Sequence, residues 1–391
     1  MPYKLMPTFQ TYPWGSKSYI QTQLGLPEFM GNTLAEMWLG AHPKAPGSIE
    51  IGNDLLTLNR FISNNPQTIL GAAATVNEGQ LPFLLKVLAA DEPLSIQVHP
   101  DKATAMRGFA DEDLAGIALD DPQRSFKDNN HKPEMMFALT KFDMMCGFRA
   151  YREIIDNFCM FALESLWQSF TPFAANPSPL SLKNLFTEVL SSTIPQLEEF
   201  SRHIYSNTSP AGKDKSWIRD ICLQLISIYN LDVGIVSPLL LNLFQLNPGE
   251  AIYLEAGILH AYLKGAGIEL MANSDNVIRG GLTPKFIDKD TLFSITNFQP
   301  FQPAILLGNK TGEYVTRYHC PVQEFELQVL NVEGKLTIQV NNKPQILLWW
   351  EGEALLNDGI TLHKGESAFV TATETELSIT GNCLIFLASL P

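Results

Sequence analysis

The sequence contains few cysteines for its length, few charged residues and no long apolar run. Five cysteines are scattered over 391 residues, and no two of them form a C-x-x-C pair. This pattern argues against a disulfide framework and against a cysteine-based metal site. No window of about twenty residues is apolar enough to span a membrane, and the N-terminus lacks the pattern of a secretory signal. We therefore expect a cytoplasmic protein.

Charged residues are also scarce, and basic ones more so than acidic ones. Charged residues make up 17% of the chain, and acidic side chains outnumber basic ones by 41 to 27. The net charge of −14 repels polyanions, which disfavours nucleic acid and anionic membranes as partners. A small anionic substrate is compatible with this balance if basic side chains gather locally. Because 45% of the residues are hydrophobic, the chain can bury a large core, and we expect a globular protein. We also expect it to be a monomer.

Turn residues and apolar periodicity divide the chain into β-rich and helical parts. Residues 1–148 contain short apolar runs broken by proline and glycine, which is typical of strands joined by turns. Apolar residues recur at three- and four-residue spacing between 149 and 231, which predicts amphipathic helices. The strand pattern returns over 232–300 and continues over 301–391. The sequence thus predicts a mainly β protein, a sandwich or jelly roll, with a helical insert.

A weak internal repeat lies in the second half of the chain. The sixteen-residue stretches that begin at Leu246 and Leu362 align without gaps on a leucine, a Gly-Glu pair and an alanine. Each stretch is typical of a strand that follows a tight turn. Glu376 stands in the second stretch where His260 stands in the first, so we expect a related β unit without a metal. Chance similarity between two such units is the alternative.

Candidate metal ligands are found among the seven histidines and their neighbours. In the run PLSIQVHP, alternation along an extended chain places Ser95, Gln97 and His99 on one face. An exposed polar strand face is the simpler interpretation of this spacing. However, Glu134 at the start of an apolar run and His260 after a glycine turn add oxygen and nitrogen ligands. With Gln97 and His99 they form a set suited to a divalent metal such as zinc.

The other histidines have weaker signals. His203, His319 and His363 have no ligand partners at a suitable spacing, so we interpret them as structural. His42 lies in a loop rich in glycine and proline, and we interpret it as structural too. His131 directly precedes the stretch that contains Glu134.

A polar loop over residues 267–285 follows His260 and contains Glu269, Asp275, Arg279 and Lys285. A hydrogen-bonded surface loop is one interpretation, because the loop is rich in turn-forming residues. A binding loop is the other, since an arginine and a lysine in an acidic protein could hold a phosphate or stabilise an oxyanion.

Two further lysines could add to a local positive field. Lys132 precedes the Pro-Glu pair of the candidate metal ligand. Lys86 lies within the apolar run LPFLLKVL, where it could also extend its stem along a strand face without any functional role.

Seven stretches, in the same order along most of the chain, together resemble the type I mannose-6-phosphate isomerases, also called phosphomannose isomerases. The resemblance is most specific in the last stretch, and it is weakest in the helical insert and after residue 300. The stretches are YPWGSK, AEMWLGAHPK, LPFLLKVL, PLSIQVHPDK, HKPEMMFAL, LNPGEAIYLEAGILHAYL and ELMANSDNVIRGGLTPKFID.

The resemblance implies three domains. Residues 1–148 and 232–300 would form a cupin-like jelly-roll catalytic domain, and residues 149–231 a helical domain inserted into it. Residues 301–391 would form a second, C-terminal cupin-like β domain without a metal.

The resemblance also implies one zinc ion per chain and a catalytic arginine. Matched motif by motif, the arginine is Arg279, and the metal ligands are Gln97, His99, Glu134 and His260.

The implied reaction is the reversible interconversion of mannose 6-phosphate and fructose 6-phosphate, an aldose–ketose isomerisation. A proton moves between C2 and C1 through a cis-enediol, whose developing charge zinc and a nearby cation can stabilise. A general base is also needed within hydrogen-bond reach of the substrate. The candidates by type and position are Lys132, Asp275, Glu269 and His99.

A metal-bound imidazole nitrogen cannot also accept a proton, so Asp275 and Lys132 are preferred over His99, and the sequence does not choose between them. We expect four other polar residues to contact the substrate. They are Lys86, Lys285, Ser95 and Glu269.

Two other classes of protein use similar ligands. A cupin oxygenase would hold iron in the same nitrogen and oxygen set, and a sugar-binding protein could hold a closed structural zinc. The cations at Arg279 and Lys285 argue against the structural zinc, because such a site has no use for an oxyanion partner.

Overall fold

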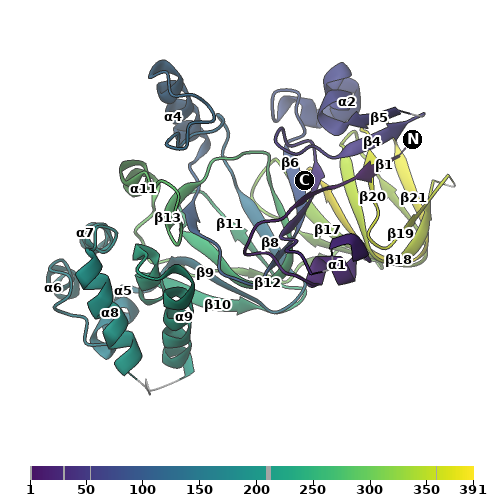
Figure 1. Cartoon of the computed structure of the whole chain (residues 1–391). Coiled ribbons are helices and arrows are strands. Elements are labelled where there is room, and N and C mark those ends of the chain that lie inside the picture. The colour runs from purple at the N-terminus through teal and green to yellow at the C-terminus, as the bar shows by residue number, and fades with distance from the viewer. Residues whose placement is uncertain (1, 30, 53, 208–212, 358) are drawn as a thin grey trace.

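The computed structural model describes residues 2–29, 31–52, 54–207, 213–357 and 359–391. Its strands form two large antiparallel sheets, one of 11 strands (sheet 1) and one of 10 strands (sheet 2). Figure 1 shows a group of helices, sheet 1 and sheet 2 side by side in that order. In the described part of the chain, no helix combines the length and the apolar character needed to cross a membrane. The predicted mainly β fold with a helical insert is confirmed.

Sheet 1 has two halves that share one long strand, β12 (His260–Ala272). Residues 265–272 of β12 pair with the half that faces sheet 2, here called the inner half. Residues 260–264 pair with the outer half. The strand changes partners at Gly265, whose φ is +130°. A Cβ there would lie 2.6 Å from the carbonyl oxygen of Lys141, so only glycine fits.

The two halves of sheet 1 have these strands. The inner half consists of β2 (Thr8–Gln10), β3 (Glu36–Gly40), β6 (Phe83–Ala90), β8 (Glu134–Ala138), β11 (Ala251–Leu254) and β14 (Ile305–Leu306). The outer half consists of β7 (Ile96–Val98), β9 (Phe142–Phe148), β10 (Leu241–Leu246) and β13 (Ile278–Gly281).

Alternation along the inner strands separates a core face from a site face. In β6, Phe83, Leu85 and Val87 belong to the core between sheet 1 and sheet 2. Lys86 points to the opposite face, toward the interior between the two halves of sheet 1. Apolar residues of both halves, such as Met136 and Met144, fill part of that interior. Polar residues on the same faces are therefore brought together inside the jelly roll.

Sheet 2 contains the C-terminal strands together with three strands from the start of the chain. Strand β1 (Tyr3–Met6) pairs with β20 and with β4, which pairs in turn with β5. Residues near the N-terminus thus form part of the same sheet as the C-terminal strands. The division into three domains stays a prediction. The other strands are β4 (Ser48–Ile51), β5 (Asp54–Thr57), β15 (Asn309–Lys310), β16 (Val315–Tyr318), β17 (Glu326–Gln339), β18 (Gln345–Leu356), β19 (Ile360–His363), β20 (Ser367–Val370) and β21 (Glu376–Ser389).

The internal repeat corresponds to equivalent elements in the two sheets. The first copy contains β11 and the start of β12 at His260, and the second contains β20 and the start of β21 at Glu376. Strands β11 and β20 begin and end at aligned residues, and β12 and β21 begin at aligned residues. Glu376 is exposed, whereas His260 is buried.

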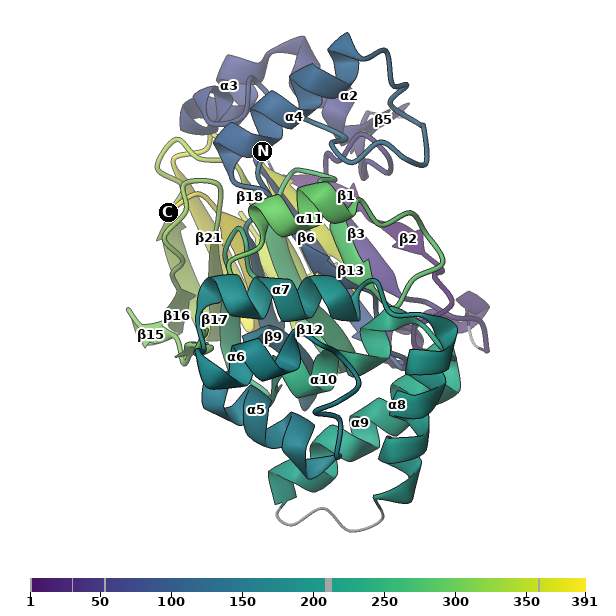
Figure 2. The same cartoon turned by 90° about the vertical axis from the view of Figure 1, so that its left-hand side faces the viewer.

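The helical segment covers the outer half of sheet 1, as Figure 2 shows. Its apolar faces form one core with Ile96 and Val98 of β7 and with Ile278 of β13. Residues that alternate with these, such as Gln97 and Arg279, are consequently directed to the other face of the strands. The helices are α5 (Tyr151–Met160), α6 (Phe170–Ala175), α7 (Pro179–Val189), α8 (Ile194–Ser206) and α9 (Lys213–Tyr229).

The remaining α-helices lie outside this segment. They are α1 (Tyr19–Gln23), α2 (Leu58–Asn64), α3 (Pro66–Leu70), α4 (Lys102–Leu114), α10 (Ser237–Leu240) and α11 (Lys289–Ile295).

Candidate metal centre and active site

Three predicted metal ligands meet inside the jelly roll. Glu134 opens β8 in the inner half, His260 opens β12, and His99 directly follows β7 in the outer half. Each offers a ligand atom within 4.8 Å of the other two. Nε2 of His99 lies 3.4 Å from Oε1 of Glu134, and Nε2 of His260 lies 3.3 Å from Oε2. All three side chains are buried.

Gln97 is placed beside this group by strand pairing. It lies directly opposite His260 of β12 on one side and Arg279 of β13 on the other. Opposed residues in antiparallel strands point to the same face. The register therefore puts the amide of Gln97, the imidazole of His260 and the guanidinium of Arg279 in one row.

Backbone carbonyls fix the tautomers of both histidines. Nδ1 of His99 lies 2.6 Å from the carbonyl oxygen of Asn276, and Nδ1 of His260 lies 2.9 Å from that of Ile258. A carbonyl can only accept, so each Nδ1 carries the hydrogen and donates it. Each Nε2 then has a free lone pair toward Glu134, as metal ligation requires.

The electrostatics of the site keep these groups in their metal-binding forms. Burial lowers the pKa of His99 to about 4, because together with the charge of Lys132 it outweighs the opposing effect of the Glu134 carboxylate. The imidazole is therefore neutral at neutral pH. Burial opposes ionisation of Glu134, but the positive charge of Lys132 and the contacts with His99 and His260 hold its pKa well below the ordinary value. The ammonium nitrogen of Lys132 lies 2.6 Å from Oε1 of Glu134.

The residues fit a zinc ion. Nε2 of His99, Nε2 of His260 and Oε2 of Glu134 are buried without a hydrogen-bond partner in the described part of the chain, and Oε1 of Glu134 has the ion pair with Lys132. Buried polar atoms are rarely left in this state unless another group satisfies them. Two neutral imidazoles, a carboxylate and the neighbouring amide of Gln97 are ligands that suit zinc.

A row of charged and aromatic side chains crosses the site face of the inner half. Lys86 donates a hydrogen bond to Oε2 of Glu269 at 2.8 Å and lies 3.6 Å from Oε1 of Glu36. Its ammonium also lies over the ring of Trp38, 5.1 Å from the centroid. Burial opposes the charge of Lys86, but the two carboxylates outweigh it and raise the pKa. Tyr262 completes the row by donating to Oε1 of Glu269 at 2.9 Å.

Sequence reasoning missed three members of this row, namely Glu36, Trp38 and Tyr262. Glu36 and Trp38 alternate in AEMWLG, so a strand would place them on one face. This two-residue spacing is the signal in the sequence that could have identified Glu36 and Trp38. Their connection with Lys86 depends on pairing between β3 and β6, in which Trp38 lies opposite Lys86.

Asp275 lies at a second charged group, which includes a histidine interpreted as structural from the sequence. Oδ1 of Asp275 is 3.4 Å from Nε2 of His42, and Oδ2 is 2.8 Å from Nζ of Lys44. Burial opposes ionisation of Asp275, but His42 and Lys44 together hold its pKa well below the ordinary value. Asp275 also directly precedes Asn276, whose carbonyl orients His99.

Two predicted cations lie at the rim of the site. Arg279 is half-buried, which lowers its pKa, and Lys285 is exposed. The pKa of Lys285 is lowered by partial burial and then by the positive charges of Arg279 and Lys44. Arg279 has no ion-pair partner among the described residues. Ser95, the last predicted contact, is half-buried just before β7, and the structure gives it no polar partner in the described ranges.

The carboxylate of Asp232 supports the loop between Arg279, which lies on β13, and Lys285. Oδ1 of Asp232 accepts hydrogen bonds from the backbone of Gly234 at 2.7 Å and of Leu282 at 2.6 Å. Oδ2 accepts from the backbone of Thr283 at 3.2 Å. These bonds hold Leu282 at a φ of +55°, which is unusual for a residue with a side chain.

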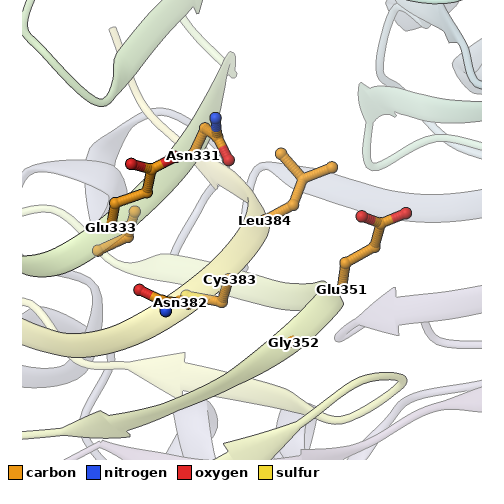
Figure 3. Close-up of a pocket in the computed structure, with 8 residues that line it drawn as sticks. Asn331, Glu333, Glu351, Gly352, Asn382, Cys383 and Leu384 are labelled. Carbon is orange, nitrogen blue, oxygen red and sulfur yellow. The ribbon is translucent and has the colours of Figure 1, made fainter.

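A separate hollow of about 430 Å³ lies on sheet 2, between β17, β18 and β21. Figure 3 shows its lining, with Glu333 and Glu351 on opposite sides of Asn382. None of the predicted site residues lines it, so it is distinct from the candidate active site.

Comparisons with known proteins agree with this geometry. Residues 3–151 match the model of the phosphomannose isomerase type I catalytic domain, and residues 314–389 match that of the mannose-6-phosphate isomerase cupin domain. The mannose-6-phosphate isomerase of Escherichia coli is 38% identical to this chain, and the alignment covers 97% of each. That of Rattus norvegicus is 32% identical and covers 97% of this chain and 96% of its own.

Solved structures give the same result. A zinc-bound mannose 6-phosphate isomerase superimposes with a TM-score of 0.91 at 36% identity, covering 100% of this chain and 99% of its own. A mutant phosphomannose isomerase from Salmonella typhimurium superimposes with a TM-score of 0.91 at 35% identity and the same coverage. The chain belongs to the type I phosphomannose isomerase family.

Proposed function

We propose that this protein is a zinc-dependent isomerase that interconverts mannose 6-phosphate and fructose 6-phosphate. The observation that carries the proposal is the convergence of His99, Glu134 and His260, with unpartnered ligand atoms, inside the jelly roll of a phosphomannose isomerase. Gln97 would be the fourth ligand. When bound, zinc would supply a Lewis acid that polarises an oxygen of the substrate.

Proton transfer requires a base that is unprotonated before the reaction. Asp275 meets this requirement, since its pKa is held well below the ordinary value and its side chain is 24% exposed. We propose that it removes the proton from C2 of mannose 6-phosphate while the electron pair forms the C1–C2 double bond and O1 gains the negative charge. The hydroxyl proton then moves from O2 to O1, and the proton held by Asp275 is returned to C1 as the C2–O2 double bond forms, which gives the ketose.

Lys132 suits a different role. Its ammonium is buried against Glu134, so it is a proton donor or a fixed positive charge rather than a base. We propose that Lys132 and Arg279 stabilise the negative oxygen of the enediol from two sides. Arg279 lies directly opposite Gln97 in the pairing of β13 with β7, and this position supports the assignment.

The remaining predicted contacts divide by charge. Lys86 and Glu269 already neutralise each other, so we propose that they orient the sugar hydroxyls. Lys285 has no carboxylate partner in the described part of the chain, and we propose that it binds the phosphate. We propose that the hydroxyl of Ser95 donates a hydrogen bond to the phosphate.

We further propose that the protein acts as a monomer in the cytoplasm. The five cysteines are free, which suits a reducing compartment. The most exposed large apolar side chains lie on separate elements, such as Leu114 on α4 and Leu180 on α7, and single exposed apolar residues need no partner.

An assay that identifies the product tests the proposal. Purified protein is incubated with mannose 6-phosphate before chelation, after chelation and after zinc is restored. We expect fructose 6-phosphate to form, to disappear with the metal and to return with zinc. A fully zinc-loaded protein without turnover would remove the isomerase from consideration. Oxygen consumption with iron would favour the oxygenase, and inactivity with every metal would favour a sugar-binding protein.

A further inference from the structure

We propose that Lys44 is a positioning residue that responds to the substrate: its ammonium rests on Asp275 in the free protein and moves to the phosphate when the sugar phosphate binds. This inference rests on the proposed function, because it assumes that Asp275 is the base. It adds a mechanism by which the phosphate, remote from the reacting carbons, controls the chemistry at C2.

The two oxygens of Asp275 are held by very different partners. Oδ2 is 2.8 Å from Nζ of Lys44, whose side chain is 64% exposed, and Oδ1 is 3.4 Å from Nε2 of His42, whose side chain is 4% exposed. An exposed lysine on a flexible stem contributes little to an ion pair and can leave it at small cost. The contact with Lys44 is therefore the replaceable one.

His42 is held by a backbone hydrogen bond and by an aromatic neighbour. Its Nδ1 accepts a hydrogen bond from the backbone N–H of Lys44 at 3.3 Å, so Nε2 carries the hydrogen that faces Asp275. The ring packs edge-to-face against Trp38 with the centroids 5.0 Å apart. Trp38 is held in turn by a hydrogen bond of 2.9 Å to Glu36. Asp275 thus stays oriented by His42 after Lys44 has left.

The ammonium of Lys44 also belongs to a group of cations. Besides burial, the positive charges of Arg279 and Lys44 lower the pKa of Lys285. Besides burial, the charge of Lys44 also lowers the pKa of Lys127. A phosphate dianion would attract all of these cations, and it would compete with the Asp275 carboxylate for the ammonium of Lys44. Loss of the ammonium leaves the Asp275 carboxylate more basic, which is the direction that proton abstraction requires.

A double-mutant cycle on phosphate binding tests this exchange. Inorganic phosphate is titrated into the zinc-loaded protein and into its Lys44→Ala, Asp275→Asn and doubly substituted forms. We expect Lys44→Ala to weaken phosphate binding, and Asp275→Asn, which releases Lys44, to tighten it, each by about fivefold. The gain from Asp275→Asn should vanish in the Lys44→Ala background. An equal gain in both backgrounds would show a general charge effect and overturn the exchange.

Turnover of two sugars gives a second readout. Lys44→Ala should lower kcat/KM for mannose 6-phosphate about tenfold, and should raise kcat/KM for unphosphorylated mannose about two- to fivefold, because Asp275 is then free of the ammonium. Lys44→Arg should behave like the unsubstituted protein, and so should Lys310→Ala on β15. A Lys44→Ala variant that loses both activities, or changes neither, would contradict the proposal.

The two hypotheses fail separately. If the unsubstituted protein does not convert mannose 6-phosphate, the proposed function is wrong. If that conversion is intact but the two sugars respond alike to Lys44→Ala, the isomerase stands and only the role of Lys44 is wrong.

Discussion

Gln97 lies directly opposite His260 in two neighbouring antiparallel strands, and Arg279 lies directly opposite Gln97 in the next strand. A metal ligand, its neighbour and the cation expected at the oxyanion are therefore set by one backbone register rather than by loops. Strand pairing holds such a row firmly, because a slip of one residue would turn every side chain to the other face.

Replacing Gln97 tests whether this amide is a metal ligand. We expect Gln97→Ala to weaken zinc binding by at least about tenfold. Removing a residue that only supports a metal ligand already lowers metal affinity by about that factor. Competition with a chromogenic chelator measures the affinity. Gln245→Ala is a matched control, because that glutamine is exposed on β10. Unchanged zinc affinity in Gln97→Ala would leave three protein ligands.

Substitutions at His260 and Arg279 should separate metal binding from turnover. His260→Ala should lose zinc and activity together. Arg279→Ala should keep one zinc per chain and lose about 100- to 1,000-fold in kcat, as expected when a donor to an oxyanion is removed. Metal analysis of the dialysed proteins, alongside kcat, provides the comparison. An active, metal-free His260→Ala protein would be incompatible with the ligand assignment.

Asp232 should influence catalysis from outside the site. Asp232→Ala leaves backbone N–H groups of Gly234 and Leu282 without their acceptor, so we expect a loss of about 1–3 kcal/mol in the free energy of unfolding. The freed loop should also displace Arg279 and lower kcat while zinc is retained. Urea unfolding and kinetics would be compared with Asp220→Ala, whose side chain is 68% exposed on α9. Equal kcat in the two variants would show that Asp232 does not position Arg279.

The metal-free protein should lose stability as the pH falls. The pKa of His99 is about 4 in the folded chain against an ordinary 6.5. Between these values the unfolded chain binds a proton that the folded chain refuses, so unfolding becomes easier by about 3 kcal/mol as the pH falls through this window. The lowered pKa of Glu134 adds a loss in the same direction at more acidic pH.

Urea unfolding of the metal-free protein at pH 7 and pH 4.5 would measure this dependence. His99→Gln cannot titrate and should show a clearly smaller change between the two conditions. Identical changes in the two proteins would assign the pH dependence to other groups.

Much of the fold was predictable because local patterns dominate it. The period of 3.6 residues marked the helical segment, and alternation in PLSIQVHP placed Gln97 on the face opposite Ile96, which packs against the helices. The repeat from Leu246 and Leu362 identified equivalent strands in the two sheets.

What the sequence did not reveal depends on pairing between distant segments. Strand β1 joins sheet 2 through β20, more than 350 residues later, and no local pattern records such a partner. The loop rich in glycine and proline favoured a structural role for His42, because its partner Asp275 lies more than 200 residues later in the chain. The role of Glu36 likewise emerges only when β3 and β6 are adjacent.

The most direct measurement is a titration of the metal-free enzyme with zinc while the conversion of mannose 6-phosphate is followed. We predict that the rate rises in proportion to added zinc and stops rising at one zinc per chain, and that His99→Ala recovers no activity at the same zinc concentrations. Full activity without zinc, or full recovery by His99→Ala, would contradict the assignment of the reaction to this site.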